Sequence, residues 1–361
     1  MQVTQPKTQI FNCIDLLKFI CAILVIIIHI KPFGNVVSKS ISDCLNFGLQ
    51  NYLARIAVPF FFVSSGFFLY KKSSIKDFDI TYSIQYIKKL FRLYFTWTII
   101  YLPLIIRDLL KDEQGINHAI LIFFRNSIFT GSFVHLWFIP ALIFAVVLVS
   151  FLLKRKINPK TIITISLLFY ITSLFAQSWF GFIKPLEFQL PTFWSSLKFI
   201  QRIIETTRDG LFEGFFFVSL GMCFAFYNFN FNKNKASIGF IISMFFLLIE
   251  TLSLHHFGYV RAYDLYLFLV PSVIFMFYIS LNINLTNRLI YKTLRILSTL
   301  IFLSHLLINA IVYEILKIIY EPFTESWVQF LLTLMLSIIM SYTIIRISEY
   351  KRFIWLKYLY S

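Results

Sequence analysis

Three ionisable residues in one apolar run are candidates for chemistry: Asp15, Lys18 and His29. A charge or an imidazole inside a membrane-length helix is costly, so such groups are functional candidates by default. At about 100° per residue, Lys18 and His29 lie on nearly the same helix face, with Asp15 about 40° away. A neutral imidazole suits general-base work on a hydroxyl group. We interpret all three as catalytic residues, with a histidine that only packs against a neighbouring helix as the alternative.

A second group of residues is typical of a phosphate site. Lys88, Lys89 and Arg92 precede a long apolar run, and Lys89 and Arg92 share a helix face. Basic side chains bind phosphate through charge-assisted hydrogen bonds. We expect these three residues to bind a polyphosphorylated donor from the cytosol. The alternative is that they only mark the cytosolic end of a membrane span.

Arg55, His135 and Trp137 are candidates for binding a second substrate. Arg55 shares a helix face with Pro59 and Gly66, and it either contacts an anionic group or extends to the membrane interface. Pro59 frees a backbone carbonyl, and Gly66 allows close approach of another helix or a ligand. His135 and Trp137 begin a later apolar run, where an indole either anchors at the interface or stacks on a substrate.

Two further candidates lie later in the chain. His305 is near the middle of an apolar run, and we expect it to face the same interior as His29. An interhelical hydrogen bond without chemistry is the alternative for His305. Arg208 precedes another apolar run, where it either binds the second substrate or pairs with a neighbouring acid. We interpret both residues as substrate-binding.

The composition is that of a polytopic membrane protein. Of 361 residues, 58% are hydrophobic and 14% are charged, and the mean hydropathy is +0.77. The charged share is well below the usual quarter of a soluble domain. A net charge of +16 would suggest nucleic acid in a soluble protein. Here the charges lie between apolar runs, so we expect membrane lipids and no nucleic acid as partners.

The sequence contains none of the common catalytic or metal-binding motifs. It has no GxSxG elbow, HExxH pair, Walker loop or dinucleotide fingerprint. Its four cysteines are scattered and show no metal-ligand spacing, which also makes a disulfide scaffold unexpected. We expect no metal site.

The apolar runs predict an all-α membrane protein with about ten transmembrane helices. If both termini are cytoplasmic, most of the 33 basic residues and few of the 17 acids fall on the cytosolic side, as the positive-inside rule requires. We expect residues 1–361 to form one membrane-embedded domain, with a longer outer loop at 181–210. The predicted spans are 14–31, 50–70, 91–110, 136–153, 161–180, 211–228, 238–256, 263–281, 295–317 and 327–347.

Four of these segments together resemble the acyltransferase type-3 family of bacterial integral-membrane O-acyltransferases. The segments are Asp15-Leu16-Leu17-Lys18 with His29, the run from Val58 to Phe67, Lys89-Leu90-Phe91-Arg92, and His135-Leu136-Trp137-Phe138. Weaker similarity continues around Gly210 and through Phe302-Leu303-Ser304-His305, so the resemblance covers almost the whole chain.

The resemblance implies a function and a location. It implies a ten-helix domain in the bacterial cytoplasmic (inner) membrane. This domain takes acyl-CoA from the cytosol and transfers the acyl group, usually acetyl, to a hydroxyl of a cell-envelope glycan. His29 matches the essential histidine of the family, and Lys89 and Arg92 match a basic pair. The family often has arginine where this chain has Lys18 and Lys89, and lysine lacks the bidentate fork of arginine.

Together these observations predict an O-acetyltransferase with acyl-CoA as donor and a glycan or lipid-linked saccharide as acceptor. We expect the donor phosphates near Lys88, Lys89 and Arg92, and the donor arm in a cavity between the first, second, third and ninth spans. His29 would be the general base. A transporter or flippase of lipid-linked glycans would explain the same spans without chemistry. A glycan polymerase is a further alternative, which the near-neutral outer side disfavours.

Overall fold

The computed structural model is helical throughout the residues it describes, which are 11–34, 38–73, 78–111, 115–192, 195, 207, 209–230, 232–258 and 260–361. Seven helices are long and apolar enough to cross a membrane, and three shorter apolar helices accompany them. Within these ranges there is no named strand, and an isolated bridge joins Phe33 to Ser326. The chain is therefore an all-helical, multi-pass membrane protein.

The first part of the chain, up to Ala176, consists of helices joined by short connections. Their bounds are α1 Asn12–His29, α2 Lys39–Gly48, η1 Leu49–Leu53, η2 Ala54–Ile56, α3 Ala57–Tyr70, α4 Ile80–Leu109, α5 Ile116–Phe129, α6 Phe138–Lys154 and α7 Pro159–Ala176.

The second part continues in the same way. Its bounds are α8 Phe180–Ile183, α9 Leu186–Gln189, η3 Gly210–Gly214, α11 Phe215–Phe226, α12 Lys233–Phe257, α13 Leu269–Asn282, α14 Leu289–Ile319, η4 Glu321–Phe323, α15 Trp327–Ile347 and η5 Lys351–Leu359.

Short polar side chains set the starts of several helices. The side chains of Asp79, Asn158, Asn232 and Ser326 each accept a hydrogen bond from a backbone N–H in the first turn of the helix that follows. Such caps satisfy donors that have no partner inside the helix. Because Asp79 caps α4, this helix begins at Ile80, well before the predicted membrane span 91–110. The basic cluster therefore lies inside α4.

The helix Lys39–Tyr70 is continuous but irregular in its middle. Five residues at Leu49–Leu53 form a π-helical turn, and three at Ala54–Ile56 form a 3₁₀ turn. Pro59 lies three residues after this turn; it has no N–H, and its ring crowds the carbonyl four residues earlier, which is that of Arg55. A second π turn, Gly210–Gly214, leads into α11. Such turns often lie at functional sites.

Helices α3 and α11 approach each other closely through two glycines. A Cβ atom on Gly66 would lie 2.4 Å from the Val218 carbonyl oxygen, and one on Gly221 would lie 2.2 Å from the Val63 carbonyl oxygen. Small residues let membrane helices pack backbone against backbone. The expectation that Gly66 allows close helix approach is confirmed.

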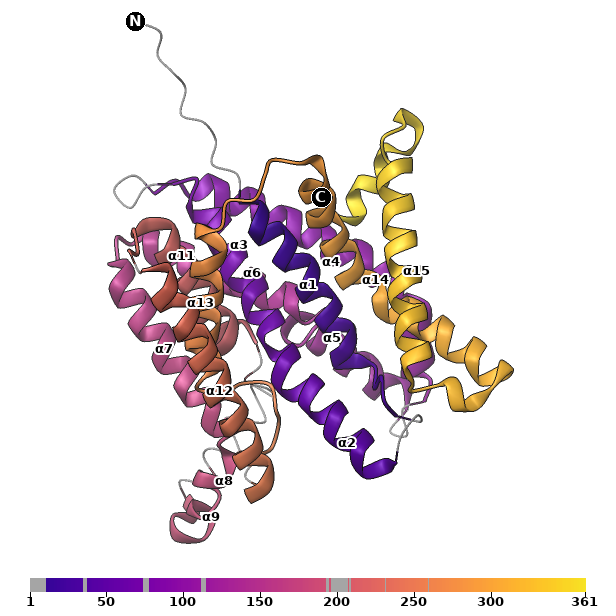
Figure 1. The fold of residues 1–361 in the computed structure, drawn as a ribbon, viewed down its shortest axis with the longest axis horizontal. Helices are drawn as coiled ribbons and strands as arrows, with labels where there is room; N and C mark the ends of the chain where they lie inside the picture. Colours follow the sequence, from indigo (N-terminus) through magenta and orange to yellow (C-terminus); the bar gives the residue numbers. More distant parts are fainter. Residues whose placement is uncertain are drawn as a thin grey trace, which may run out of the picture.

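The helices surround one large core of buried apolar residues drawn from α1, α3, α4, α6, α7, α11, α13 and α14. Figure 1 shows α1 in the middle of the molecule, with α7, α11, α12 and α13 on one side and α14 and α15 on the other. Short α8 and α9 project beyond the lower end of α7, and the C-terminus lies near the upper ends of α1 and α14. Helix α1 thus lies in protein along both of its sides.

Each of the ten predicted spans falls largely on a helix of the structure. Seven meet the length and hydropathy expected of a span, whereas α6, α13 and the helix Gly210–Phe226 are shorter. The 14-residue helix α5 was not predicted and lies in the connection 111–135. Ten spans with both termini in the cytosol remain a prediction.

Candidate active site

Two cavities lie near the polar residues of α1. The first, which we call the histidine pocket, has a volume of about 50 Å³, and its lining includes His29, Arg55, His135, Trp137, Glu213 and Asp264. The second, which we call the basic cavity, has a volume of about 660 Å³, and its lining includes Lys18, Lys72, Lys89 and Arg295. Most of the predicted site residues therefore line one cavity or the other.

Three histidines meet beside the histidine pocket. The rings of His29 and His305 have centroids 5.3 Å apart, and those of His135 and His305 are 5.1 Å apart. His29 is the last residue of α1, His305 lies in the middle of α14, and His135 precedes α6. The prediction that His305 faces the same interior as His29 is confirmed.

Backbone carbonyls fix the tautomers of two of these histidines. His305 Nδ1 lies 2.8 Å from the Phe302 carbonyl oxygen, and His135 Nε2 lies 3.0 Å from that of Leu303. A ring nitrogen that faces a carbonyl must carry the proton, which leaves the other nitrogen as an acceptor. His305 Nε2 and His135 Nδ1 are buried and have no hydrogen-bond partner among the described residues. Two imidazole nitrogens without a hydrogen-bond partner among the described residues therefore lie at or beside the histidine pocket.

Charged side chains line the rest of the histidine pocket. Arg55 donates to Asp264 at 2.5 Å and to the Asn51 side-chain oxygen at 2.9 Å. Both partners of the Arg55–Asp264 pair are about five-sixths buried. Glu213, on the π turn before α11, is 2% exposed. A pocket with both signs of charge can orient a polar substrate.

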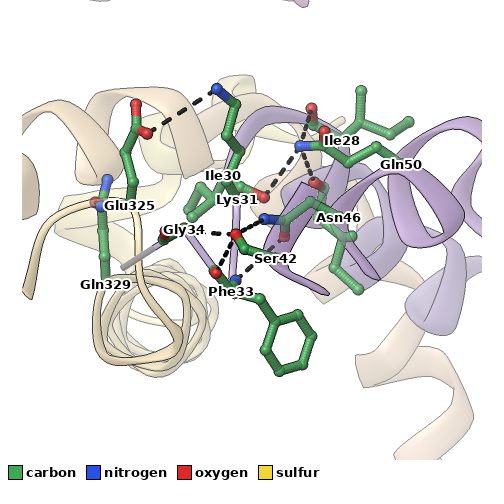
Figure 2. Close-up of polar contacts among 11 residues, drawn as sticks. Ile28, Ile30, Lys31, Phe33, Gly34, Ser42, Asn46, Gln50, Glu325 and Gln329 are labelled. Atoms are coloured by element: carbon green, nitrogen blue, oxygen red, sulfur yellow. Dashed lines mark hydrogen bonds and ion pairs between the residues drawn. The ribbon is translucent and has the colours of Figure 1, made fainter. Parts of the chain in front are cut away.

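The end of α1 that carries His29 is held by its neighbours. The Gln50 amide nitrogen donates to the carbonyls of Ile28 and Ile30 at 3.2 and 3.3 Å, as Figure 2 shows. Carbonyls at a helix C-terminus have no partner inside the helix, and Gln50 supplies one. The backbone around His29 is thereby fixed against the irregular part of Lys39–Tyr70.

The loop that follows α1 is tied down in the same way. Ser42 donates to the Phe33 carbonyl, and the Phe33 N–H donates to the Asn46 side chain at 3.1 Å. Lys31 lies 4.0 Å from Glu325, which precedes α15 (Figure 2). A catalytic side chain must be held by packing and second contacts to act precisely. These contacts hold the α1 end against both α2 and the α14–α15 connection.

The basic cavity collects cations from four segments of the chain. Lys18 comes from α1, Lys72 from the turn after α3, Lys89 from α4 and Arg295 from α14. Asp15 is buried and lies 3.8 Å from Arg295. Lys18 therefore lines the basic cavity and Asp15 lies beside it, and neither lines the histidine pocket that contains His29. The cavity also takes lining from α6, which was not expected.

Lys88 and Arg92, the other two residues of the predicted phosphate site, do not line the basic cavity. Arg92 donates to the Ser361 carbonyl at 2.6 Å and lies over the Tyr358 ring. Lys88 and Arg92 are absent from the described residues that line the basic cavity, whereas Lys89 is present. The helical repeat explains the position of Lys88, which is one position from Lys89 and points about 100° away. Arg92 shares the face of Lys89 and instead contacts the C-terminal segment.

Arg208 lies outside the described residues. Its neighbour Asp209 is described, and it accepts hydrogen bonds from the N–H groups of Leu211 and Phe212 at 2.9 and 3.0 Å. Burial raises the pKa of Asp209 from an ordinary value of 3.8 to about 6. Asp209 thus caps the π turn that positions Glu213.

The structure adds Arg295, Asp264 and Glu213 to the candidate site. Arg295 and Glu213 each had a signal, since both are charges next to or within an apolar run. Asp264 lies in the irregular connection between α12 and α13, and its pairing with Arg55 depends on the path of that connection. Among the described residues, no three His, Cys, Asp or Glu side chains form a group that could hold a metal ion.

Comparison with known protein families assigns most of the chain to one family. Residues 11–346 match the family model described as an acyltransferase domain. The chain therefore belongs to this acyltransferase family, and the resemblance noted in the sequence is confirmed.

Three relatives of this chain are named as racemases and not as acyltransferases. An amino-acid racemase of Enterococcus faecalis is 29% identical over 346 residues, which are 94% of this chain and 46% of the relative. A second amino-acid racemase of that species is 29% identical over 80% of this chain and 38% of the relative. A serine/alanine racemase of Enterococcus gallinarum is 28% identical over 73% of this chain and 36% of the relative. The chain spans less than half the length of these relatives. No solved structure matches it.

Proposed function

We propose that this protein is a membrane O-acyltransferase that moves an acyl group, acetyl in the simplest case, from cytosolic acyl-CoA to a hydroxyl of a cell-envelope glycan. The observation that carries the proposal is that the two cavities are neighbours and share lining residues. Phe138 and Phe302 line both the histidine pocket and the basic cavity. A donor in the basic cavity would thus lie directly behind the histidines.

The basic cavity would bind the donor. Lys18, Lys72, Lys89 and Arg295 face one space of about 660 Å³, which is within the usual size of a ligand site. Their charges would neutralise the phosphates of CoA, and Arg295 offers a planar fork for bidentate contacts. Asp15 would hold Arg295 in place through their ion pair.

The histidine pocket, at about 50 Å³, would admit the reacting hydroxyl of the acceptor and not a whole sugar ring. Arg55, Asp264 and Glu213 can hydrogen-bond this hydroxyl, and the Trp137 indole can pack against the carbon atoms next to it. His29 would be within this pocket as the general base. In the proposed orientation, with both termini in the cytosol of a bacterium, the pocket lies toward the outer side of the inner membrane.

The reaction would proceed as a direct transfer. His29 takes the proton of the acceptor hydroxyl while the hydroxyl oxygen forms a bond to the acyl carbon. The carbon–sulfur bond breaks, its electron pair goes to sulfur, and the CoA thiolate receives the proton from His29. The products are an ester and free CoA. His305 would stabilise the protonated His29 through its bare Nε2 nitrogen.

The direct test uses purified protein in liposomes with radiolabelled acetyl-CoA and cell-envelope glycan as acceptor. The proposal predicts labelled glycan and one free thiol released for each ester formed. Mass spectrometry of surface glycans from cells with and without the protein should show the matching acetyl groups. Absence of both acceptor-dependent thioester cleavage and glycan acetylation would reject the proposal.

Transport of an amino acid is a second candidate function. It is favoured by the mixture of Arg55 with two acids in the histidine pocket, which suits a zwitterion, and the racemase relatives are named for amino acids. Uptake of radiolabelled serine or alanine by the same liposomes, without thioester cleavage, would support transport over acyl transfer.

A further inference from the structure

Three phenylalanine rings lie where the two cavities meet. Phe61 comes from α3, Phe138 from the first position of α6 and Phe302 from α14. The ring centroids of Phe138 and Phe302 are 5.4 Å apart, and Phe61 lies 5.8 Å from Phe302 and 6.2 Å from Phe138. Each ring thus contacts the other two in an edge-to-face arrangement, which is a favourable geometry for aromatic pairs.

The surrounding groups hold this cluster in place. Phe138 packs on Phe62 with a centroid distance of 4.5 Å, and Phe302 lies 5.8 Å from the His135 ring. Phe61 and Phe302 are both buried. The carbonyl of Phe302 also accepts the hydrogen bond from His305 Nδ1. The cluster is therefore coupled to the histidines by packing and by the backbone.

The two cavities differ greatly in size on either side of these rings. The basic cavity measures about 660 Å³ and the histidine pocket about 50 Å³. A site needs roughly 10–15 Å³ by this measure to hold one water molecule, so the histidine pocket has room for only a few small groups. A long acyl chain that passed the rings would find no space beyond them.

We propose that Phe61, Phe138 and Phe302 form an aromatic constriction that determines which acyl chains reach His29. The inference rests on the proposed acyl transfer and adds the specificity of that reaction. Short acyl groups would pass between the rings, and longer ones would be stopped on the basic side.

The first test measures transfer from acetyl-, propionyl-, butyryl- and hexanoyl-CoA by the full chain in liposomes. Phe302→Leu and Phe138→Leu should each raise the rate with butyryl-CoA relative to acetyl-CoA by about tenfold or more, because a methylene in a tight pocket changes discrimination by that order. Phe302→Trp should lower the ratio for propionyl-CoA. The control is Phe277→Leu, which removes the same atoms from a buried ring that lines neither cavity.

The outcomes separate the two proposals. Acetyl transfer with an unchanged chain-length profile in the Phe302 and Phe138 variants would overturn the constriction and leave the proposed function intact. An equal change in Phe277→Leu would also overturn it. Native protein that transfers no acyl group from any donor would reject the proposed function, and the specificity filter with it.

A second measurement needs no change in the ring cluster. Val134 lines the histidine pocket and is exposed. In a Val134→Cys, Cys44→Ser protein, a membrane-impermeant thiol reagent should label residue 134 from the His29 side and not from the basic side. Labelling from the basic side at a comparable rate would show an open path and contradict the constriction.

Discussion

At the scale of single residues, the central feature is a group of three histidines, His29, His135 and His305, of which His135 and His305 are buried. Imidazoles away from water are costly unless their nitrogens are bonded or used. His305 and His135 each hydrogen-bond a backbone carbonyl with one ring nitrogen, and the other ring nitrogen has no partner among the described residues. Bare nitrogens beside a pocket are what proton transfer to or from a hydroxyl requires.

The donor site makes a prediction about single cations. Lys89→Ala and Arg295→Ala should each weaken acetyl-CoA binding by about tenfold, because each removes a charge-assisted contact to phosphate. Isothermal titration in detergent would measure the dissociation constants. Lys88→Ala is the matched control, since it removes the neighbouring charge outside the cavity lining. Equal losses in Lys88→Ala and Lys89→Ala would indicate a general charge effect and not a binding site.

Sequence reasoning could predict part of the site at this scale. Periodicity placed Lys18, Lys89, His29 and His305 on inward faces, and all four lie at the cavities or the histidine cluster. Arg92 has the same spacing from Lys89 that predicts a shared face, yet its partner is the C-terminal segment. Which basic residue faces a cavity depends on what packs against the helix, and a helix pattern alone does not contain that information.

At the scale of helices, the close contact between α3 and α11 can be tested by adding a methyl group at one of its glycines. Gly221→Ala should lower the thermal midpoint in detergent, because its Cβ would lie 2.2 Å from the Val63 carbonyl oxygen, and overpacking costs about 1–3 kcal/mol. Gly48→Ala is the control: nothing lies within 4 Å of its Cβ, and alanine favours a helix by about 0.5–1 kcal/mol. An unchanged midpoint for Gly221→Ala would contradict the close contact.

The cap of the π turn predicts a dependence on pH. Burial raises the folded-state pKa of Asp209 from 3.8 to about 6, so folding favours the protonated carboxyl. This stabilising contribution is present below about pH 4 and is lost as the pH rises through 6. Asp209→Asn keeps a capping oxygen without the titration. The midpoint of the native protein should therefore fall more steeply between pH 4.5 and 7 than that of the variant; identical pH profiles would contradict the assignment.

The helices themselves were more predictable than their details. Apolar length found all ten segments, because a lipid-exposed backbone must satisfy its hydrogen bonds within the helix. The π and 3₁₀ turns at Leu49–Ile56 were not predicted, since Pro59 indicates a disturbance but not its form. Helix α5 was not predicted: its 14 residues include Arg125 and Asn126, whereas α13 has the same length and no charged residue. The irregular turns Leu49–Ile56 and Gly210–Gly214 carry Arg55 and Glu213, which line the histidine pocket.

At the scale of the whole molecule, the basic cavity and the histidine pocket define two ends. If the basic end faces the cytosol, as the distribution of Lys and Arg predicts, Cys44 lies outside. An impermeant maleimide should then label exposed Cys44 in intact cells. In a Cys44→Ser, Lys154→Cys protein, labelling should require permeabilisation. The reverse labelling pattern would show that the topology is inverted, with the donor cavity facing away from the cytosol.

The proposed acyl transfer depends on His29 as the general base. The rate of acetyl transfer to glycan should be compared for native protein and His29→Ala in liposomes, at saturating acetyl-CoA and neutral pH. We expect the rate to fall about 100-fold or more, the usual contribution of a general base, with the dissociation constant of acetyl-CoA unchanged. Transfer at the native rate by a correctly inserted His29→Ala protein would contradict it.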